Sequence, residues 1–403
     1  MIFVCEPQIK SFGHEKVNSG FLYGLRLAFP DEKIVFYGEK SHLLAISKII
    51  EYDGIKISNI EYVEINFNTS NSLVSFISYY FLSIKILSDV RRKGSDRLFL
   101  LSISSIMLSI LKALKRRIFS EIKFTIVLHG AYEDIGIETL SEKVANYSKW
   151  EVLKFIASRL PRIFHLFDLL FFLKKSILKD SSDDFRYIFL SEHIRQNSGQ
   201  YIDLSKVPNY VVPLPTVFRE LPPALSNTYV KFAIFGRGDY EMLNKIATEL
   251  LKREIQNKYE IRIIGKDYQG LENFPNITCS SPGVKLLRSE MEKQVLDIDI
   301  ILIVYDKSKY RLSCSGSVFE SLSYVKPIIH FESDCLKNYN TEQAPIGIAC
   351  NSINEFADVM AEYINNYNFH KNTLEEFRTN ILQVRSQLTI FKSVSEIRKS
   401  FTW

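Results

Sequence analysis

The sequence predicts an α/β protein made of two Rossmann-like domains that face each other across a cleft. Three observations predict it. Short branched apolar runs alternate with longer amphipathic stretches, a proline-rich segment interrupts the alternation near the middle, and the alternation then restarts. Such alternation is typical of parallel sheets covered by helices on both faces. A chain of 403 residues exceeds one ordinary core and suits two domains of about 200 residues each.

The first half of the chain contains six strand-like runs, each short and rich in branched or aromatic residues. They lie at 1–6, 33–38, 61–66, 97–102, 124–130 and 186–191. Longer amphipathic segments separate most of them, as βαβ units require. Residues 207–227 then contain five prolines, which fix φ and remove backbone donors, so this segment indicates an extended connection. We therefore predict an N-terminal domain over 1–210 and a linker over 211–228.

The second half repeats the alternation. Strand-like runs lie at 229–236, 259–265, 297–305, 326–331 and 345–350, and helical patterns lie at 239–255 and 352–367. Ser352, with Glu355 three residues later, has the spacing of a capping box at a helix start. We predict a second domain over 229–370 and a helical tail over 371–403 that packs back toward the first domain. In open α/β sheets, ligands bind at the carboxyl ends of the strands.

The composition argues against several classes of protein. The net charge of +5 does not require a nucleic-acid partner. Five cysteines without CxxC or zinc-ligand spacing indicate reduced, buried thiols in a cytoplasmic protein. No apolar run reaches the length of about 18 uncharged residues expected of a membrane span, and the nearest is 99–117. P-loop, GxGxxG and HExxH motifs are absent from the sequence.

The stretch SCSGSVFESLSYVKPII, residues 313–329, carries the clearest chemical signal. A helix that begins near Ser315 presents free backbone N–H groups and the positive end of its dipole, which together form an anion site. Gly316 lets a ligand approach the backbone, and Ser317 adds a hydroxyl. Glu320 lies about one turn further on, where a carboxylate accepts hydrogen bonds from a diol such as ribose. Phosphate at the helix tip and ribose one turn away predict a nucleotide site.

A second signal lies at the first strand-to-helix turn of the same domain. Gly236, Arg237 and Gly238 occupy this turn, where glycine allows close approach and arginine binds a pyrophosphate with two hydrogen bonds. Arg311 is a second candidate cation.

These motifs resemble those of the GT-B glycosyltransferases that use nucleotide sugars, particularly the bacterial group related to glycogen and sucrose synthases. In that group the second domain opens with a strand that ends in Gly-Arg, as at Gly236 and Arg237. It later carries a glutamate seven residues before a proline, as Glu320 precedes Pro327. The resemblance covers the domain order and these two short motifs. It implies that Glu320 binds the donor ribose and that the Gly-Arg turn binds the diphosphate.

One position departs from the family pattern. Many members carry a further glutamate eight residues before the ribose glutamate, where it contacts the donor sugar, and this chain has Leu312 there. The departure leaves the donor sugar and the stereochemical course open. The resemblance offers Tyr310 and Arg311 as substitutes for the missing contact.

The first domain contributes candidates for catalysis and acceptor binding. His129 lies at the end of the strand-like run at 124–130, and the resemblance implies that it faces the donor sugar, either as a hydrogen-bond donor or as a base. Glu133 is a rival base on the same loop, as is Asp134. The loop over 6–21 precedes the first helix and supplies three acceptor-binding candidates, namely His14, Glu15 and Lys16.

Two regions of the first domain are both basic and apolar. Residues 85–123 carry a net charge of +7, from ten basic and three acidic residues. Residues 149–179 carry a net charge of +5, from seven basic and two acidic residues. Basic amphipathic helices with aromatic residues lie in bilayer interfaces. These regions therefore predict peripheral contact with the inner face of the cytoplasmic membrane and a lipid-linked acceptor.

The sequence thus predicts a glycosyltransferase that moves a hexose, with a UDP-sugar favoured, to a growing lipid-linked bacterial surface polysaccharide such as O-antigen or capsule. No DxD motif lies on a loop after a strand, so we expect neither a metal nor another cofactor. Two alternatives stay open, namely a non-catalytic binding subunit of the same fold and a sugar-nucleotide epimerase.

Overall fold

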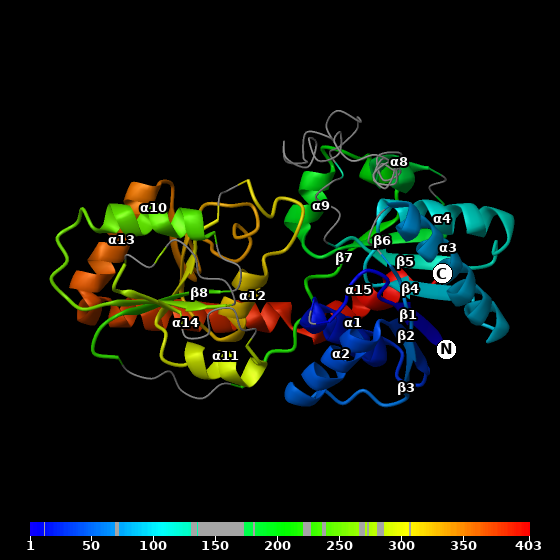
Figure 1. Cartoon of the computed structure of the whole chain (residues 1–403), viewed down its shortest axis with the longest axis horizontal. Coiled ribbons are helices and arrows are strands. Elements are labelled where there is room, and N and C mark those ends of the chain that lie inside the picture. The colour runs from blue at the N-terminus through cyan, green and yellow to red at the C-terminus, as the bar shows by residue number, and fades with distance from the viewer. Residues whose placement is uncertain are drawn as a thin grey trace. The chain divides into compact units, whose positions relative to one another are not determined.

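A computed structural model of the chain describes most of its residues (Figure 1). They are 1–11, 13–68, 72–129, 135, 173–179, 182–220, 227–235, 239–265, 271, 274–279, 286–305 and 308–403. The chain divides into two compact units. Unit 1 is Met1–Val217 together with Leu388–Trp403, and unit 2 is Phe218–Gln387.

Unit 1 contains a seven-stranded sheet in the order β3-β2-β1-β4-β5-β6-β7, and each neighbouring pair is parallel. Its strands are β1 (Ile2–Cys5), β2 (Ile34–Gly38), β3 (Ile60–Glu64), β4 (Arg97–Leu100), β5 (Lys123–Val127), β6 (Phe185–Phe189) and β7 (Asn209–Val211). Strands β1, β2 and β6 are buried along their whole length, because helices cover both faces of a parallel sheet. The strand order reverses direction between β1 and β4, which makes this the topological switch point of unit 1.

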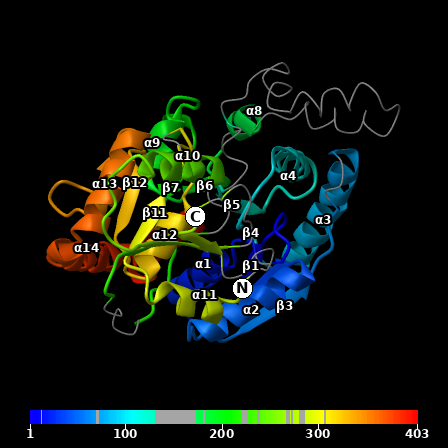
Figure 2. The same ribbon diagram turned by 60° about the vertical axis from the view of Figure 1, so that its left-hand side comes forward.

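Most of the described helices of unit 1 form two groups. The described helices are α1 (Glu15–Ala28), α2 (Lys40–Tyr52), α3 (Ser72–Arg92), α4 (Ser105–Arg117), α8 (Leu173–Leu178), α9 (Glu192–Ser198) and α15 (Ile390–Phe401). Helix α1 packs against α2 and α15, whereas α4 packs against α3 and α8. Figure 2 shows α3 beside α4.

The last helix belongs to the fold of unit 1 although it follows unit 2 in the chain. Figure 1 shows α15, in red, beside α1, in blue. Thr125 on β5 donates its hydroxyl to the carbonyl of Ser400 at 2.6 Å.

Gly20 on α1 approaches the backbone at Pro215 so closely that an added Cβ would lie 2.2 Å from the carbonyl oxygen of Pro215. Only glycine fits at such a close approach of two backbones.

Unit 2 contains a six-stranded parallel sheet in the order β10-β9-β8-β11-β12-β13. Its strands are β8 (Lys231–Phe235), β9 (Glu260–Ile264), β10 (Ile277–Cys279), β11 (Ile300–Ile303), β12 (Ile328–Phe331) and β13 (Gly347–Cys350). The described helices are α10 (Tyr240–Leu250), α11 (Arg288–Val295), α12 (Gly316–Ser323), α13 (Ile353–Asn365) and α14 (Tyr367–Leu388). The switch point of this sheet lies between β8 and β11.

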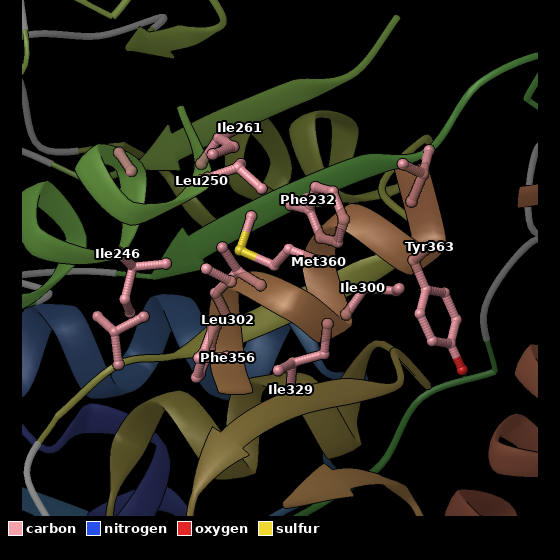
Figure 3. Packing of buried hydrophobic residues seen from close by; sticks show 14 of the residues in the cluster. Phe232, Ile246, Leu250, Ile261, Ile300, Leu302, Ile329, Phe356, Met360 and Tyr363 are labelled. Atoms are coloured by element: carbon pink, nitrogen blue, oxygen red, sulfur yellow. The ribbon is translucent and has the colours of Figure 1, made fainter. Parts of the chain in front are cut away.

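The core of unit 2 follows the two-residue period of its strands. Phe232, Ile300 and Leu302 project from one face of the sheet toward α13, where they meet Phe356 and Met360 (Figure 3). Intervening strand residues point to the opposite face, against which α11 and α12 pack. Both faces of the sheet are therefore covered, as the apolar strand sequences predict.

Two strands were missed at the sequence level. Strand β7 lies in the proline-rich segment 207–227, between Pro208 and Pro213, and β10 has three residues. Both are edge strands, where proline is tolerated because one side of the strand makes no ladder hydrogen bonds. The interpretation of 207–227 as a connection alone is therefore wrong over Asn209–Val211.

The capping box predicted at Ser352 is half confirmed. Its hydroxyl accepts the backbone N–H of Glu355 at 3.1 Å, so Ser352 is the N-cap of α13. The Glu355 carboxylate accepts the N–H of Asn351 at 2.7 Å instead of that of Ser352. All five cysteines lie in the described part of the chain, where none forms a disulfide. Cys5, Cys335 and Cys350 are buried as expected, whereas Cys279 and Cys314 are half-buried, so the expectation of buried thiols is wrong for these two.

One expectation about the membrane needs correction. The stretch 99–117 forms the end of β4 and helix α4. Within the described ranges, α3 is instead the one helix that is long and apolar enough to cross a membrane, by length and composition alone.

Candidate functional site

The two loops at the switch point of unit 2 are joined by an ion pair. One loop follows β8 and leads into α10, and the other follows β11 and leads into α12. Asp239 is the N-cap of α10 and accepts the N–H of Met242 at 3.0 Å. Lys309, on the other loop, donates to the second oxygen of Asp239 at 2.7 Å. Gly236 and Arg237, predicted to bind the diphosphate, lie outside the described residues.

The N-terminus of α12 is the predicted anion site. Ser315 is the N-cap, and its buried hydroxyl accepts the N–H of Val318 at 3.4 Å. Gly316 is exposed, and a Cβ built at this residue would meet nothing within 4 Å. Ser317 is half-buried on the same turn. The first turn of α12 therefore presents its backbone to open space, as an anion site at a helix N-terminus requires.

Glu320 lies on the second turn of α12 and is paired with an arginine that the sequence analysis missed. Arg288, the first residue of α11, donates from Nη1 to Oε1 of Glu320 at 2.6 Å. Both side chains are mostly buried, with 17% of Arg288 and 14% of Glu320 exposed. The two residues are 32 positions apart in the sequence, so no local pattern relates them.

The loop between β11 and α12 holds three further predicted residues. Tyr310 has a φ of 60° and packs its ring 4.6 Å from that of Tyr305. Arg311 lies 3.9 Å from the carboxylate of Asp334, and its side chain is exposed. Leu312 is buried. A leucine at this position therefore adds to the core of unit 2 instead of presenting a polar group to a ligand.

Two predicted histidines of unit 1 lie together. His129 follows β5, and His14 precedes α1 with a φ of 55°. Their Nε2 atoms are 3.0 Å apart, although the residues are 115 positions apart in the sequence. Burial lowers the pKa of His14, while burial and the neighbouring His14 lower the pKa of His129 to about 3. Both rings are therefore neutral at pH 7, and one Nε2–H donates to the other ring.

The other unit 1 candidates are placed as follows. Glu15 is the first residue of α1, Lys16 follows it, and both are half-buried. Glu133 and Asp134 lie outside the described residues.

Beneath the loop that carries His14 lies a buried carboxylate that sequence reasoning missed. Glu6 is completely buried directly after β1, at the switch point. Its Oε1 accepts the N–H groups of Gln8 and Ile9, at 3.0 and 3.2 Å, and the hydroxyl of Ser102 beyond β4. Its Oε2 accepts Nδ2 of Asn18 at 3.0 Å. Four donors thus offset the cost of burying this carboxylate.

Asn18 extends this network to a third histidine. Its Nδ2 also lies 2.9 Å from Nε2 of His42, and Nδ1 of His42 lies 2.8 Å from the carbonyl of Ser11. Because the carbonyl only accepts, Nδ1 must carry the proton and Nε2 must accept from Asn18. The network therefore anchors the loop between β1 and α1 at Gln8, Ile9 and Ser11. An acidic residue directly after a buried strand, as in IFVCE, is the sequence signal that indicates Glu6.

No group of three or more His, Cys, Asp or Glu side chains with the arrangement of a metal site occurs among the residues that the structure describes.

No protein-family model matches the chain, and no curated protein matches its sequence. The fold, in contrast, is that of the GT-B glycosyltransferases. A glycosyltransferase from Rickettsia africae superimposes with a TM-score of 0.61 at 13% identity, covering 99% of this chain and 97% of that one. The lipopolysaccharide outer core galactosyltransferase WaaB gives a TM-score of 0.59 at 14% identity, with 99% of both chains covered. Anabaena HepE in complex with UDP gives a TM-score of 0.55 at 11% identity, with 99% of both chains covered.

Proposed function

We propose that the protein is a glycosyltransferase that moves a hexose from a nucleoside diphosphate sugar, with UDP favoured, to a lipid-linked bacterial surface polysaccharide. The observation that carries the proposal is the α12 site at the switch point of unit 2. Its first turn is open at Gly316, and Glu320 lies one turn further along the helix. An anion site next to a carboxylate that can accept from a diol matches the chemistry of a nucleotide diphosphate.

In this proposal unit 2 binds the donor. The backbone N–H groups at Ser315, Gly316 and Ser317 bind the diphosphate, and Arg237 and the helix dipole stabilise its charge as it leaves. Glu320 accepts the ribose hydroxyls. Tyr310 and Arg311, on the adjoining loop, contact the donor sugar in place of the family glutamate. This scheme requires no metal.

Unit 1 supplies the acceptor side. The acceptor hydroxyl attacks the anomeric carbon, the bond from that carbon to the diphosphate breaks, and a base takes the hydroxyl proton. The family resemblance offers His129 as this base, and its ring is neutral at pH 7 and so able to accept a proton. Its pKa of about 3 makes it a weak base in this state, because a general base is most effective when its pKa lies near the working pH. Glu133 is the rival base, and His14, Glu15 and Lys16 are the acceptor-binding residues. The choice of a hexose as the transferred sugar rests on the family resemblance.

Two structural neighbours support the choice of substrates. HepE is in complex with UDP, which favours a uridine nucleotide. WaaB is a lipopolysaccharide outer core galactosyltransferase, which favours a surface glycan as acceptor.

The acceptor proposal includes contact with the inner face of the cytoplasmic membrane. Within the basic region 85–123, α3 ends in Arg91 and Arg92 and α4 ends in Arg116 and Arg117, whereas Lys115 is buried and pairs with Asp184. The preceding turns of α3 expose Ile77, Tyr80 and Phe81 by 47%, 38% and 65%. Their spacing of three and four residues puts them on one helix face. A helix that exposes apolar side chains along one face and ends in basic residues favours an anionic lipid surface. Of the second basic region, 149–179, the structure describes 173–179.

The donor site is tested by thermal shift of the purified protein with UDP, GDP, CDP, ADP and TDP, with and without magnesium. A ligand that binds only the folded state raises the melting temperature. We expect one diphosphate to raise it without magnesium and Glu320→Ala to abolish the shift. Failure of all five nucleotides would refute the nucleotide site.

The membrane contact is tested by cosedimentation with phosphatidylglycerol vesicles and with phosphatidylcholine vesicles. We expect binding to the anionic vesicles alone, and weaker binding by Phe81→Glu. The matched control is Leu44→Glu, because Leu44 is an exposed leucine on α2. Equal binding by Phe81→Glu and the wild-type protein would contradict the assignment to α3.

One observation favours a second candidate, a non-catalytic binding subunit. Leu312 is buried at the position where many family members carry a sugar-binding glutamate. A protein that binds a nucleotide sugar but neither transfers nor hydrolyses it, with its acceptor present, would support this candidate over the enzyme.

A further inference from the structure

We propose that Arg288 is a positioning residue for Glu320, and that the pair recognises the ribose hydroxyls of the nucleotide. The inference rests on the proposed function, because it concerns the same nucleotide site of unit 2. It assigns a role to a residue that no motif in the sequence indicates.

The geometry of the pair is specific. The carboxylate of Glu320 projects from the second turn of α12, and Nη1 of Arg288 reaches Oε1 at 2.6 Å from the start of α11. The same Nη1 lies 3.8 Å from the sulfur of Met291, one turn further along α11. With 17% and 14% of the side chains exposed, the pair is shielded more than an ordinary surface ion pair, which contributes little. The contact orients the carboxylate before a ligand arrives.

The position of Arg288 in its helix points to a role other than helix stability. A cation at the first residue of α11 lies at the positive end of the helix dipole, which disfavours it. Arg262 provides the contrast in the same unit. It donates to the carbonyl of Gln294 at 2.8 Å and to Asp297 at 2.6 Å, at the other end of α11, where the dipole favours a cation.

Charge balance explains what Arg288 contributes. Glu320 lies about one turn from the first residues of α12, where the proposed diphosphate binds. An uncompensated carboxylate there would repel the diphosphate. The guanidinium offsets this charge. A carboxylate accepts about four hydrogen bonds, so the Arg288 contact and a ribose hydroxyl are compatible.

The test compares the binding of UDP and 2′,3′-dideoxy-UDP by calorimetry. The proteins are wild type, Arg288→Met, Arg288→Lys and the control Arg262→Met, whose arginine is also paired at 2.6 Å and is 16% exposed. We expect the wild type and Arg262→Met to prefer UDP by about tenfold or more, the effect of a hydrogen bond to a charged group. In Arg288→Met we expect the ratio of the affinity for UDP to the affinity for 2′,3′-dideoxy-UDP to fall toward one.

Arg288→Lys keeps the positive charge but loses the planar fork of the guanidinium. We expect it to recover affinity for both nucleotides without recovering the full preference for UDP. Circular dichroism and melting temperature establish that each variant is folded, and Arg288→Lys carries the test if Arg288→Met does not fold.

Three results overturn the inference and are distinguishable. If the wild type binds UDP and the Arg288 variants keep the full preference for UDP, Arg288 does not position Glu320, although the proposed function stands. A loss of affinity that is equal for both nucleotides also rules out positioning, because it reflects charge alone. If the wild type binds none of the five nucleoside diphosphates, the proposed function fails and this inference fails with it.

Discussion

Replacing the buried Glu6 by glutamine, a change of one atom, tests the polar network under the His14 loop. Glutamine keeps the oxygen that accepts from Gln8, Ile9 and Ser102, but its Nε2 then faces Nδ2 of Asn18, so two donors meet. Rotating the Asn18 amide by 180° turns its oxygen toward this group. His42 must then donate from Nε2, so its Nδ1 loses the proton bonded to the carbonyl of Ser11. Every arrangement with a neutral His42 ring leaves one partner unsatisfied.

The expected cost follows from the bonds involved. One unsatisfied buried group costs about 1–3 kcal/mol, and the bonds that remain to Oε1 weaken because their acceptor is no longer charged. We expect Glu6→Gln to lower the free energy of unfolding of unit 1 by about 2–4 kcal/mol. Glu121→Gln is the control, because Glu121 pairs with Arg91 at the surface, where a salt bridge contributes about 0–1 kcal/mol.

Urea unfolding followed by tryptophan fluorescence measures the effect on unit 1. Trp403 packs against Phe401 in unit 1, with ring centroids 6.0 Å apart, and the range Phe218–Gln387 of unit 2 contains no tryptophan. The signal therefore excludes the unfolding of unit 2, which would otherwise complicate a two-state fit. A midpoint for Glu6→Gln within error of the wild type would refute the network of hydrogen bonds and the tautomer assigned to His42.

Three further predictions address other parts of the chain. Gly316→Ala should leave the melting temperature unchanged, because its Cβ enters open space. It should weaken UDP binding about tenfold by blocking one backbone hydrogen bond to phosphate. Calorimetry measures the affinity for UDP, and an affinity equal to that of the wild type would contradict the α12 site. Gly20→Ala should destabilise unit 1 by about 1–3 kcal/mol, because its Cβ meets the Pro215 carbonyl at 2.2 Å; an unchanged urea midpoint would contradict that close approach. The pKa of His129 is lowered to about 3, so the unfolded state, with a pKa of about 6.5, binds more protons between these values. Stability should therefore fall as the pH drops from about 6.5, by up to about 1.4 kcal/mol per pH unit from this residue. His129→Asn should show a shallower fall in urea unfolding between pH 6.5 and 4, and an equal slope would count against the buried neutral ring.

Much of the architecture follows from local sequence. Apolar runs such as IFVC and IILI form strands buried on both faces, and the amphipathic segment that begins after Ser352 forms α13. Period and capping act over a few residues, so the sequence alone predicts them. The start of α12 at Gly316 follows for the same reason, because serine before a glycine and an apolar turn is a local capping signal. Edge strands β7 and β10 are shorter than the runs on which such predictions depend.

The sequence by itself therefore determined the α/β class, most of the strands and the helix that carries Glu320. Tertiary structure alone decided which side chains meet. His14 and His129 are 115 residues apart and Arg288 and Glu320 are 32 apart, yet each pair lies within 3.0 Å. The physical reason is the parallel topology, which brings the carboxyl ends of strands distant in sequence to one edge of a sheet. The partner of a side chain there depends on strand order, which no single segment encodes.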